Sequence, residues 1–162
     1  MMTAELRGHA LRAAIEDLLF DYASTLDESM LERWPDFFTE DALYEVISQD
    51  NVEQDLRLAL LRCEGKGMIL DRMIALKDVL FYAPRRFRRF IANVRATLRS
   101  DGTIAATSSF LVLQTLVEQP TEILVAGRYH DIVVADGDQL KFRVKRCIYD
   151  TTLIPNTLVY PI

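Results

Sequence analysis

The chain has 162 residues, half of them apolar, which is enough for one well-filled core and too few for two ordinary domains, so we expect a single domain over residues 1–162. Its net charge of −5 argues against general affinity for nucleic acid or an anionic membrane, because both need a basic surface. Charged residues interrupt the apolar runs well short of the roughly 20 residues that a membrane-spanning helix needs, and charges near the start break up any signal peptide. We therefore expect a cytoplasmic protein that does not enter a membrane.

The first segment with a clear pattern is an amphipathic helix. Apolar residues recur at alternating steps of four and three, which places them on one stripe of a helix: Leu11, Ile15, Leu18, Tyr22 and Leu26. Ser29 and Glu32 then have the spacing of a capping box, which predicts a short helical stretch that Pro35 limits. An aromatic cluster follows at Trp34, Phe37 and Phe38.

The next elements are predicted from their composition and from the polar and proline residues that end them. Residues 39–41 form a polar break, and residues 42–47 are rich enough in apolar and aromatic side chains to make a strand. Helical patterns are expected over residues 53–63 and residues 68–80, the second ending before Pro84.

After this point the period of the apolar residues changes from 3.6 to 2. Four strands are expected, over residues 90–98, 104–114, 122–134 and 139–150, with turns marked by Asp-Gly pairs or proline. Strands of this length usually curl. Helices followed by a curved antiparallel meander indicate an α+β fold, in which the helices close one side of the sheet and leave a conical cavity.

The sequence lacks the residues that most metal and nucleotide sites require. It contains two histidines, His9 and His130, and two cysteines, Cys63 and Cys147, without C-x-x-C spacing. A Rieske cluster needs two thiolates and two imidazoles on paired loops, and a mononuclear iron site typically takes two histidines and a carboxylate. Dinucleotide, phosphate-loop and hydrolase-elbow motifs are absent as well. The cysteines suit two small buried thiols in a reducing compartment, although a disulfide between them stays open.

A few polar residues are candidates for acid and base chemistry inside a cone. His130 lies in a predicted strand and could act as a general base near neutral pH, or it could be an ordinary exposed strand residue. Asp41 and Tyr44, beside the aromatic cluster, could form an acid and donor pair. Their alternative roles are capping a turn for Asp41 and packing for Tyr44.

The sharpest charge feature is the arginine run at residues 85–89, interrupted only by Phe87. Nucleic acid could be its partner, but the acidic net charge disfavours this. A solvated strand entrance or a subunit interface fits better, because arginine makes bidentate bonds to carboxylates and is enriched in interfaces. The pair Asp71-Arg72 on the predicted helix has the same two interpretations, a helix-surface pair or an interface contact.

Several motifs resemble the small (beta) subunits of aromatic-ring-hydroxylating Rieske non-haem iron dioxygenases. They are W-P-x-F-F-T-x-D-A-x-Y at 34–44, D-R-M-I-A-L at 71–76, R-R-F-R-R-F-I-A-N-V at 85–94, R-x-x-x-Y-D-T-T-L at 146–153 and the final Y-P-I at 160–162. The resemblance spans nearly the whole chain and is strongest to members that act on aromatic carboxylates such as terephthalate or anthranilate. It implies the fold of nuclear transport factor 2 and ketosteroid isomerase, a helix-closed cone over a curved sheet.

The resemblance also implies an assembly. It implies a homotrimer core in a mixed hexamer of three large and three small subunits, with the Rieske iron-sulfur cluster and the mononuclear iron in the large subunit and no cofactor here. The residues that match recurrent family positions, and so are implied at the strand entrance and subunit contacts, are Asp71, Arg72, Arg86, Arg88 and Asn93. One departure is Arg89, which stands where the family usually has histidine.

The leading hypothesis is therefore a non-catalytic structural subunit of a dioxygenase that degrades aromatic compounds. The first alternative is a stand-alone isomerase, dehydratase or cyclase of the same fold, with His130, Asp41 or Tyr44 facing an open pocket. A second alternative is a module that binds a small aromatic ligand without chemistry.

Overall fold

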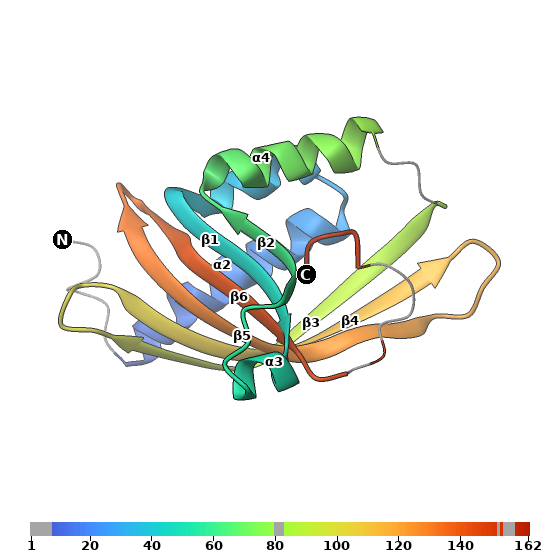
Figure 1. The fold of residues 1–162 in the computed structure, drawn as a ribbon. Helices are drawn as coiled ribbons and strands as arrows, with labels where there is room; N and C mark the ends of the chain where they lie inside the picture. Colours follow the sequence, from blue (N-terminus) through green and yellow to red (C-terminus); the bar gives the residue numbers. More distant parts are fainter. Residues whose placement is uncertain (1–7, 80–82, 152, 154–157) are drawn as a thin grey trace.

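The computed structural model describes residues 8–79, 83–151, 153 and 158–162, and its centre is one curved six-stranded sheet (Figure 1). The strand order is β2-β1-β6-β5-β4-β3. The strands are β1 (Phe38–Ser48), β2 (Ala59–Glu64), β3 (Arg85–Leu98), β4 (Ile104–Leu116), β5 (Glu122–Asp136) and β6 (Gln139–Tyr149). Strands β3 to β6 form the predicted antiparallel meander, and β1 adds to β6 in parallel.

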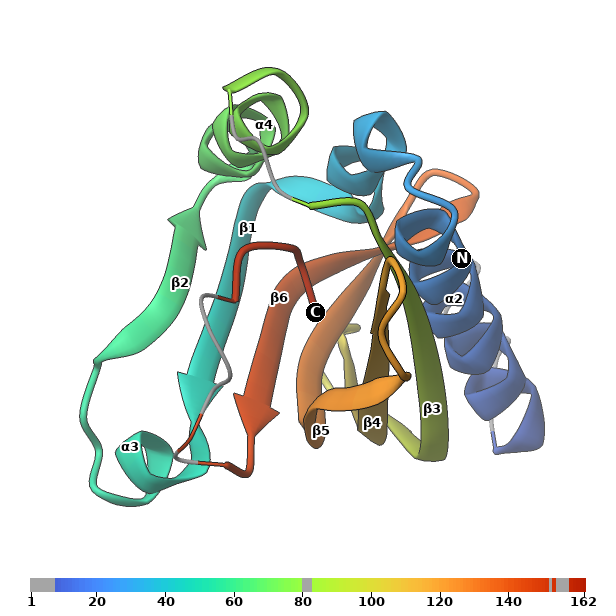
Figure 2. The ribbon, with the colours of Figure 1, turned by 90° about the vertical axis from the view of Figure 1, so that its right-hand side faces the viewer.

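The helical segments lie mainly along the concave side and the upper rim of the sheet. They are α2 (His9–Asp27), the 3-10 helix η1 (Leu31–Phe37), α3 (Gln49–Glu53), α4 (Lys66–Ile74) and the π-helix η2 (Ala75–Val79). In Figure 2 the sheet is strongly curved, with α2 packed beside β3 and α4 above β1 and β2. The predicted α+β class and the helix-closed curved sheet are confirmed. No helix among the described residues is long and apolar enough to cross a membrane.

Helix α2 confirms the predicted amphipathic stripe, since its five predicted apolar residues are all buried. The predicted capping box is wrong. Ser29 has a positive φ of 59° and makes no capping bond, and Met30 takes the cap position of η1. A residue in the left-handed region turns the chain away from α2, so its hydroxyl is not placed over the next helical turn.

The region from β1 to α4 departs most from the prediction. The expected polar break at residues 39–41 is part of β1, which starts at Phe38. The helix expected over residues 53–63 was wrong, because this stretch contains the end of α3 and then β2, which pairs antiparallel with β1. Leu56, Leu58 and Leu60 have the period of a strand, but leucine's helical propensity hid it. The helix predicted over 68–80 corresponds to α4 and η2, and Leu80 lies outside the described residues.

Strand β3 contains a bulge that changes which face its residues occupy. Asn93 has φ 56°, and the pairing with β4 shifts between Ala92 and Arg95. Phe90 and Ala92 are consequently exposed, whereas Val94 and the following alternate residues pack toward the core. The alternation predicted from Phe90 onward is therefore present along the strand, but the exposed and the buried positions exchange at the bulge. Extra residues of this kind increase the twist of a strand, which agrees with the strong curl of the sheet.

Candidate functional site

The concave side of the sheet is where this architecture could enclose a pocket, and large aromatic side chains fill it. Their ring centroids lie 5.2–6.4 Å apart, mostly edge to face. The fully buried rings are those of Tyr22, Trp34, Phe38, Tyr44, Tyr129 and Phe142. Each edge-to-face pair adds about 0.5–1.5 kcal/mol beyond simple burial. This part of the cone is a packed core, and the predicted aromatic cluster of η1 and β1 is part of it.

A buried ion pair lies against the same rings. Lys145 of β6 has 0% exposure, and its Nζ is 3.2 Å from Oδ2 of Asp131 on β5. The ammonium also lies 3.5 Å from the ring centroid of Tyr129 and 4.4 Å from that of Phe142. Burial raises the pKa of Asp131 to about 6 even though Lys145 acts to lower it. Removal from water therefore outweighs the attraction between the two groups.

Other titratable groups of the interior are held in their neutral forms. Burial raises the pKa of the Cys147 thiol to about 12. Burial, with a smaller effect of Cys147, also raises the pKa of Tyr22, Tyr44 and Tyr129 well above the usual value for phenols. These groups act at neutral pH as hydrogen-bond partners rather than as proton acceptors. Both cysteines are free and buried, as predicted.

The last described residues, 158–162, which we call the C-terminal strap, close the mouth of the cone from inside. In Figure 2 this red segment lies on the concave side of the curved sheet. Tyr22 Oη donates to the main-chain oxygen of Ile162 at 2.8 Å, and the Ile162 N–H donates to Tyr44 Oη at 2.8 Å. Cys147 Sγ donates to the same Ile162 oxygen at 3.4 Å. The strap thus occupies the polar groups of Tyr22, Tyr44 and Cys147.

Two arginines fix the strap to the rest of the molecule. Arg89, whose side chain is 2% exposed, donates to Asp27 at the end of α2 and to the Pro161 carbonyl, both at 2.5 Å. Arg72 of α4 donates to the Val159 carbonyl at 2.7 Å. Arginine fits at position 89, where the family usually has histidine, because both of its partners are hydrogen-bond acceptors. A guanidinium can donate to both at the same time.

A cavity of about 340 Å³ stays open between the strap and the ends of β3 to β5. Its wall includes Phe87, Arg89, Gln114 and Tyr160. Lys145 and Asp131 do not line it, so its contents would not reach the buried ion pair. The volume is at the small end of the range for ligand sites.

The three predicted acid and base residues are not brought together. Tyr44 lies inside the core and binds the strap. His130 is exposed on the outer face of β5, and its pKa is lowered by partial burial and by Arg128 and Arg146. Asp41 is exposed and accepts a hydrogen bond from Thr39 Oγ1 at 2.8 Å.

The residues that match recurrent family positions divide between the surface and the interior. Arg86 and Arg88 are exposed on the outer face of β3, and Asp71 is exposed on α4. Asn93 forms the β3 bulge and donates to Ser109 Oγ at 3.3 Å. Arg72 instead turns inward to the strap.

The outer face of the sheet carries a second charge cluster, which sequence reasoning missed. Glu45 of β1 has a side-chain exposure of 2% and bonds Arg62 at 2.5 Å and Arg146 at 2.6 Å. Both arginines stand directly opposite Glu45 in the neighbouring strands, and His130 is opposite Arg146. Only the pairing register of the strands brings these residues together, and this register cannot be read from the sequence alone.

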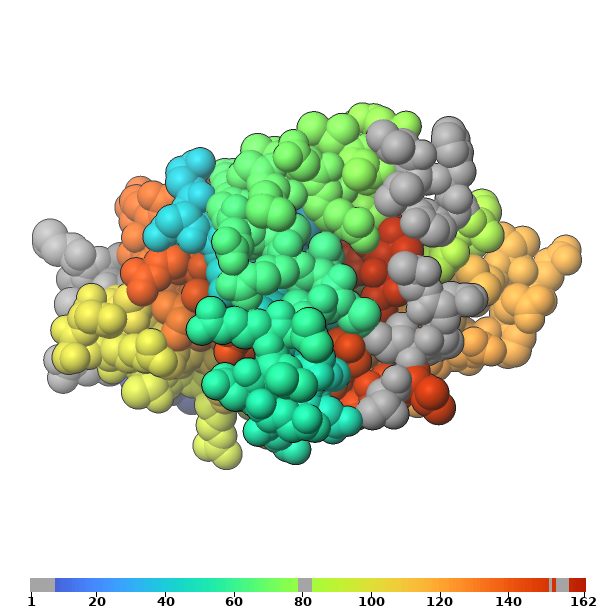
Figure 3. All heavy atoms as spheres, viewed as in Figure 1, coloured from blue at the N-terminus to red at the C-terminus, as the bar shows by residue number. Residues whose placement is uncertain are grey.

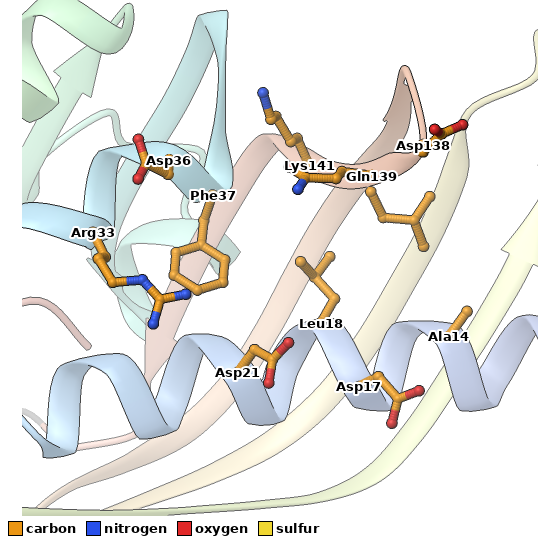
Figure 4. A pocket seen from close by; sticks show the side chains of 11 residues that line it. Ala14, Asp17, Leu18, Asp21, Arg33, Asp36, Phe37, Asp138, Gln139 and Lys141 are labelled. Carbon is orange, nitrogen blue, oxygen red and sulfur yellow. The ribbon is translucent and has the colours of Figure 1, made fainter. Parts of the chain in front are cut away.

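The surface also carries a group of exposed apolar residues and an acidic groove. Exposed apolar residues occur directly before β2, on β2 and on α4, and these elements with α3 form the face toward the viewer in Figure 3: Leu58, Leu60, Met68, Leu70 and Ile74. On another side, a groove of about 700 Å³ lies between α2, η1 and the β5–β6 hairpin. Figure 4 shows Asp17 and Asp21 on its helix wall and Asp36 and Asp138 across from them.

No group of three or more histidine, cysteine, aspartate or glutamate side chains within the described ranges is arranged to hold a metal ion.

Comparison with known proteins agrees with the fold. The model of the SnoaL-like domain family matches residues 9–146. The small subunit of anthranilate 1,2-dioxygenase from Burkholderia cepacia is 33% identical over 141 residues, which cover 87% of this chain and 88% of that protein. A beta subunit of the terminal oxygenase component of terephthalate 1,2-dioxygenase from Comamonas sp. is 29% identical, covering 87% and 92%.

A solved structure is similar at the level of both sequence and fold. It is a protein from Novosphingobium aromaticivorans assigned as the beta subunit of an aromatic-ring-hydroxylating dioxygenase, with a TM-score of 0.84, 35% identity, and coverage of 93% of this chain and 96% of that one. The expected resemblance is therefore confirmed, and the chain belongs to the SnoaL-like domain family and, within it, to the small subunits of aromatic-ring-hydroxylating dioxygenases.

Proposed function

We propose that this chain is a structural subunit that assembles with a large oxygenase subunit and has no active site of its own. The observation that carries the proposal is the filled cone. Aromatic rings and a buried ion pair occupy the interior, and the strap bonds the donors that face the mouth. The cavity of about 340 Å³ that remains beside the strap is lined by none of the three candidate acid and base residues.

In this assembly the large subunit carries the Rieske cluster, the mononuclear iron and the substrate pocket. The relatives are named for anthranilate and terephthalate, and a more distant one for p-cumate. All three compounds are aromatic carboxylates, so we propose the same class of substrate for the complete enzyme. The resemblance further supports a mixed hexamer of three large and three small subunits.

The exposed apolar residues at β2 and α4 support the proposal that the chain binds a partner. Five large apolar side chains are exposed on these two elements or directly before β2. Apolar surface of this kind in a soluble protein commonly marks an interaction site, since leaving it in water is unfavourable.

Co-expression with a large oxygenase subunit tests the proposal. The two chains should elute together from a sizing column, and the complex should contain iron and oxidise an aromatic carboxylate. Two separate peaks, with a large subunit that is fully active alone, would show that the chain is not a structural subunit of that enzyme.

The alternative of a stand-alone acid and base enzyme requires an open pocket at His130, Asp41 or Tyr44. The first two lie on the exterior and the third binds the strap. We expect the variants His130→Gln and Asp41→Asn to leave the activity of the assembled dioxygenase unchanged. Turnover of a small substrate by the isolated chain that is lost in either variant would favour the alternative.

A further inference from the structure

The cavity beside the C-terminal strap has a wall with a large apolar part. The ends of β3, β4 and β5 contribute one side of this wall and the strap contributes the other. The rings of Phe87 and Tyr160 lie in it with their centroids 5.0 Å apart and their planes tilted by 56°. Aliphatic side chains complete the apolar part: Val112, Leu116, Leu124 and Leu158. Such a wall suits a flat apolar body, because rings pack favourably against other rings.

One buried hydrogen-bond donor of the wall has no partner. The side chain of Arg89 is 2% exposed, and its two terminal nitrogens donate to Asp27 and to the Pro161 carbonyl. The third nitrogen, Nε, is buried and has no hydrogen-bond partner among the described residues. In a guanidinium the Nε–H lies on the same edge as Nη2, and Nη2 bonds Pro161, which is itself part of the cavity wall. The unpaired donor therefore lies on the edge of Arg89 that is turned toward the strap.

The charges around the cavity favour a negatively charged acceptor. Arg85 also lines the wall and donates to Gln114 Oε1 at 3.0 Å, so a second guanidinium is held there. Among the described wall residues the one carboxylate is that of Glu122, which is exposed and therefore screened by water. Asp27 balances Arg89 but is not part of the wall. A cationic ligand would face two guanidinium groups inside the cavity.

Simpler kinds of ligand match only one part of the wall. A hydrocarbon would cover the rings and aliphatic side chains but would leave the Arg89 Nε–H unpaired, and a buried donor without an acceptor is unfavourable. A small inorganic anion would accept this hydrogen bond but would leave the apolar side chains in contact with water. A ligand with an aromatic ring and a carboxylate matches both parts, because a carboxylate accepts strong hydrogen bonds from a guanidinium.

We propose that this cavity binds a small aromatic carboxylate. Its ring packs against Phe87 and Tyr160, and one carboxylate oxygen accepts a hydrogen bond from Arg89 Nε. The volume of about 340 Å³ suits a compound with a single ring. None of the three candidate acid and base residues lines the cavity, so the ligand is bound and released unchanged. The inference goes beyond the proposed function and does not rest on it, since the isolated chain contributes the whole site.

Calorimetric titration of benzoate into the purified chain tests the site. Benzoate should bind saturably and about tenfold or more tightly than two partial analogues, benzamide, which has the ring without the charge, and acetate, which has the charge without the ring. Hydrogen exchange gives a second readout. Bound benzoate should slow exchange in residues 158–162, because the ligand contacts the strap.

A pair of matched variants locates the site. Leu116→Trp places a large ring in the cavity wall and should weaken benzoate binding about tenfold or more, as expected when the space for the ligand is lost. Leu98→Trp makes the same change at another partly buried strand leucine, outside this cavity, and should leave the Kd unchanged. Arg89→Met should also abolish binding. That variant releases the strap as well, so Leu116→Trp, which keeps Arg89 and its partners, decides the location.

Three results would each overturn the inference. They are the absence of saturable benzoate binding to the wild-type chain, equal affinities for benzoate and benzamide, and an unchanged Kd in a Leu116→Trp variant whose circular dichroism spectrum shows that it is folded. Co-elution with the large subunit is measured separately. Loss of that co-elution would count against the proposed function and would leave the benzoate site unaffected.

Discussion

The buried pair of Lys145 and Asp131 gives the sharpest test of how the cone interior is stabilised. Replacing one partner leaves the other as an isolated charge among aromatic rings, so Asp131→Val and Lys145→Met should each lower the free energy of unfolding by about 3–5 kcal/mol at pH 7. For a chain of this size, that corresponds to a fall of roughly 6–20 °C in Tm. The double variant has no buried charge left at this place. We expect its stability to lie within about 1 kcal/mol of the wild type, or above it.

The pH dependence of the same pair follows from the raised pKa of Asp131. A rise from 3.8 to about 6 corresponds to roughly 3 kcal/mol, because one pKa unit is worth about 1.4 kcal/mol. The folded state holds this proton more tightly than the unfolded state, so the carboxyl lowers stability as the pH rises from about 4 to about 6, and it contributes nothing below that interval. Relative to the double variant, the wild type should therefore lose up to about 3 kcal/mol over this range.

Urea unfolding at pH 4, 5, 6 and 7 measures both effects, at one fixed protein concentration because assembly would add stability. A double variant whose loss equals the sum of the two single losses would show that the groups are not coupled, and the reasoning would be refuted. An unchanged difference between wild type and double variant across the pH series would refute the assignment of the raised pKa to Asp131.

Three further predictions concern the packing around the cone. A Cβ at Gly127 would lie 2.0 Å from the Ile148 carbonyl oxygen, so Gly127→Ala should lower the free energy of unfolding by about 3 kcal/mol or more, as in an overpacked core. Gly67 has open space around it, so Gly67→Ala should change Tm by only a few degrees. Equal Tm values for the two variants would contradict this prediction. Arg89→Met should release the strap, seen as faster hydrogen exchange of residues 158–162 with exchange in α2 unchanged apart from its last turn, and unaltered strap exchange would show that Arg89 does not hold it. Neither cysteine should react with a thiol reagent in the folded protein and both should react in urea, because the thiols are buried and their pKa values are raised; rapid reaction of the native protein would indicate an open interior.

The sequence was most informative where one face of an element is buried. The stripe of α2 and the period-2 strands from residue 104 onward were predicted to within about two residues, because burial on one side forces a regular pattern. It was least informative at β2, an edge strand with few buried residues. Such a strand is defined by its pairing with β1 and not by its own apolar pattern, so leucine-rich residues 56–61 could be taken for a helix.

The interior of the site could be predicted only in part. The aromatic cluster of η1 and β1 was visible in the sequence, but the partners of Lys145 and Arg89 were not, since each lies far away along the chain. One signal was available for Lys145 and Asp131. Both stand at inward positions of their strands. Asp131 lies between Tyr129 and Val133, which are two residues away on either side, and a charged residue at such a position must have a buried partner.

The short arginine-rich motif at residues 85–89 contributes both to the closed interior and to the charged surface. Successive residues of a strand point to opposite faces, so Arg86 and Arg88 are exposed on the outer face while Phe87 and Arg89 point into the cone. The inward arginine has a carboxylate and a carbonyl to bond. The outward arginines have no such partners among the described residues. The same run of charge therefore closes the interior through Arg89 and leaves Arg86 and Arg88 exposed on the outer face.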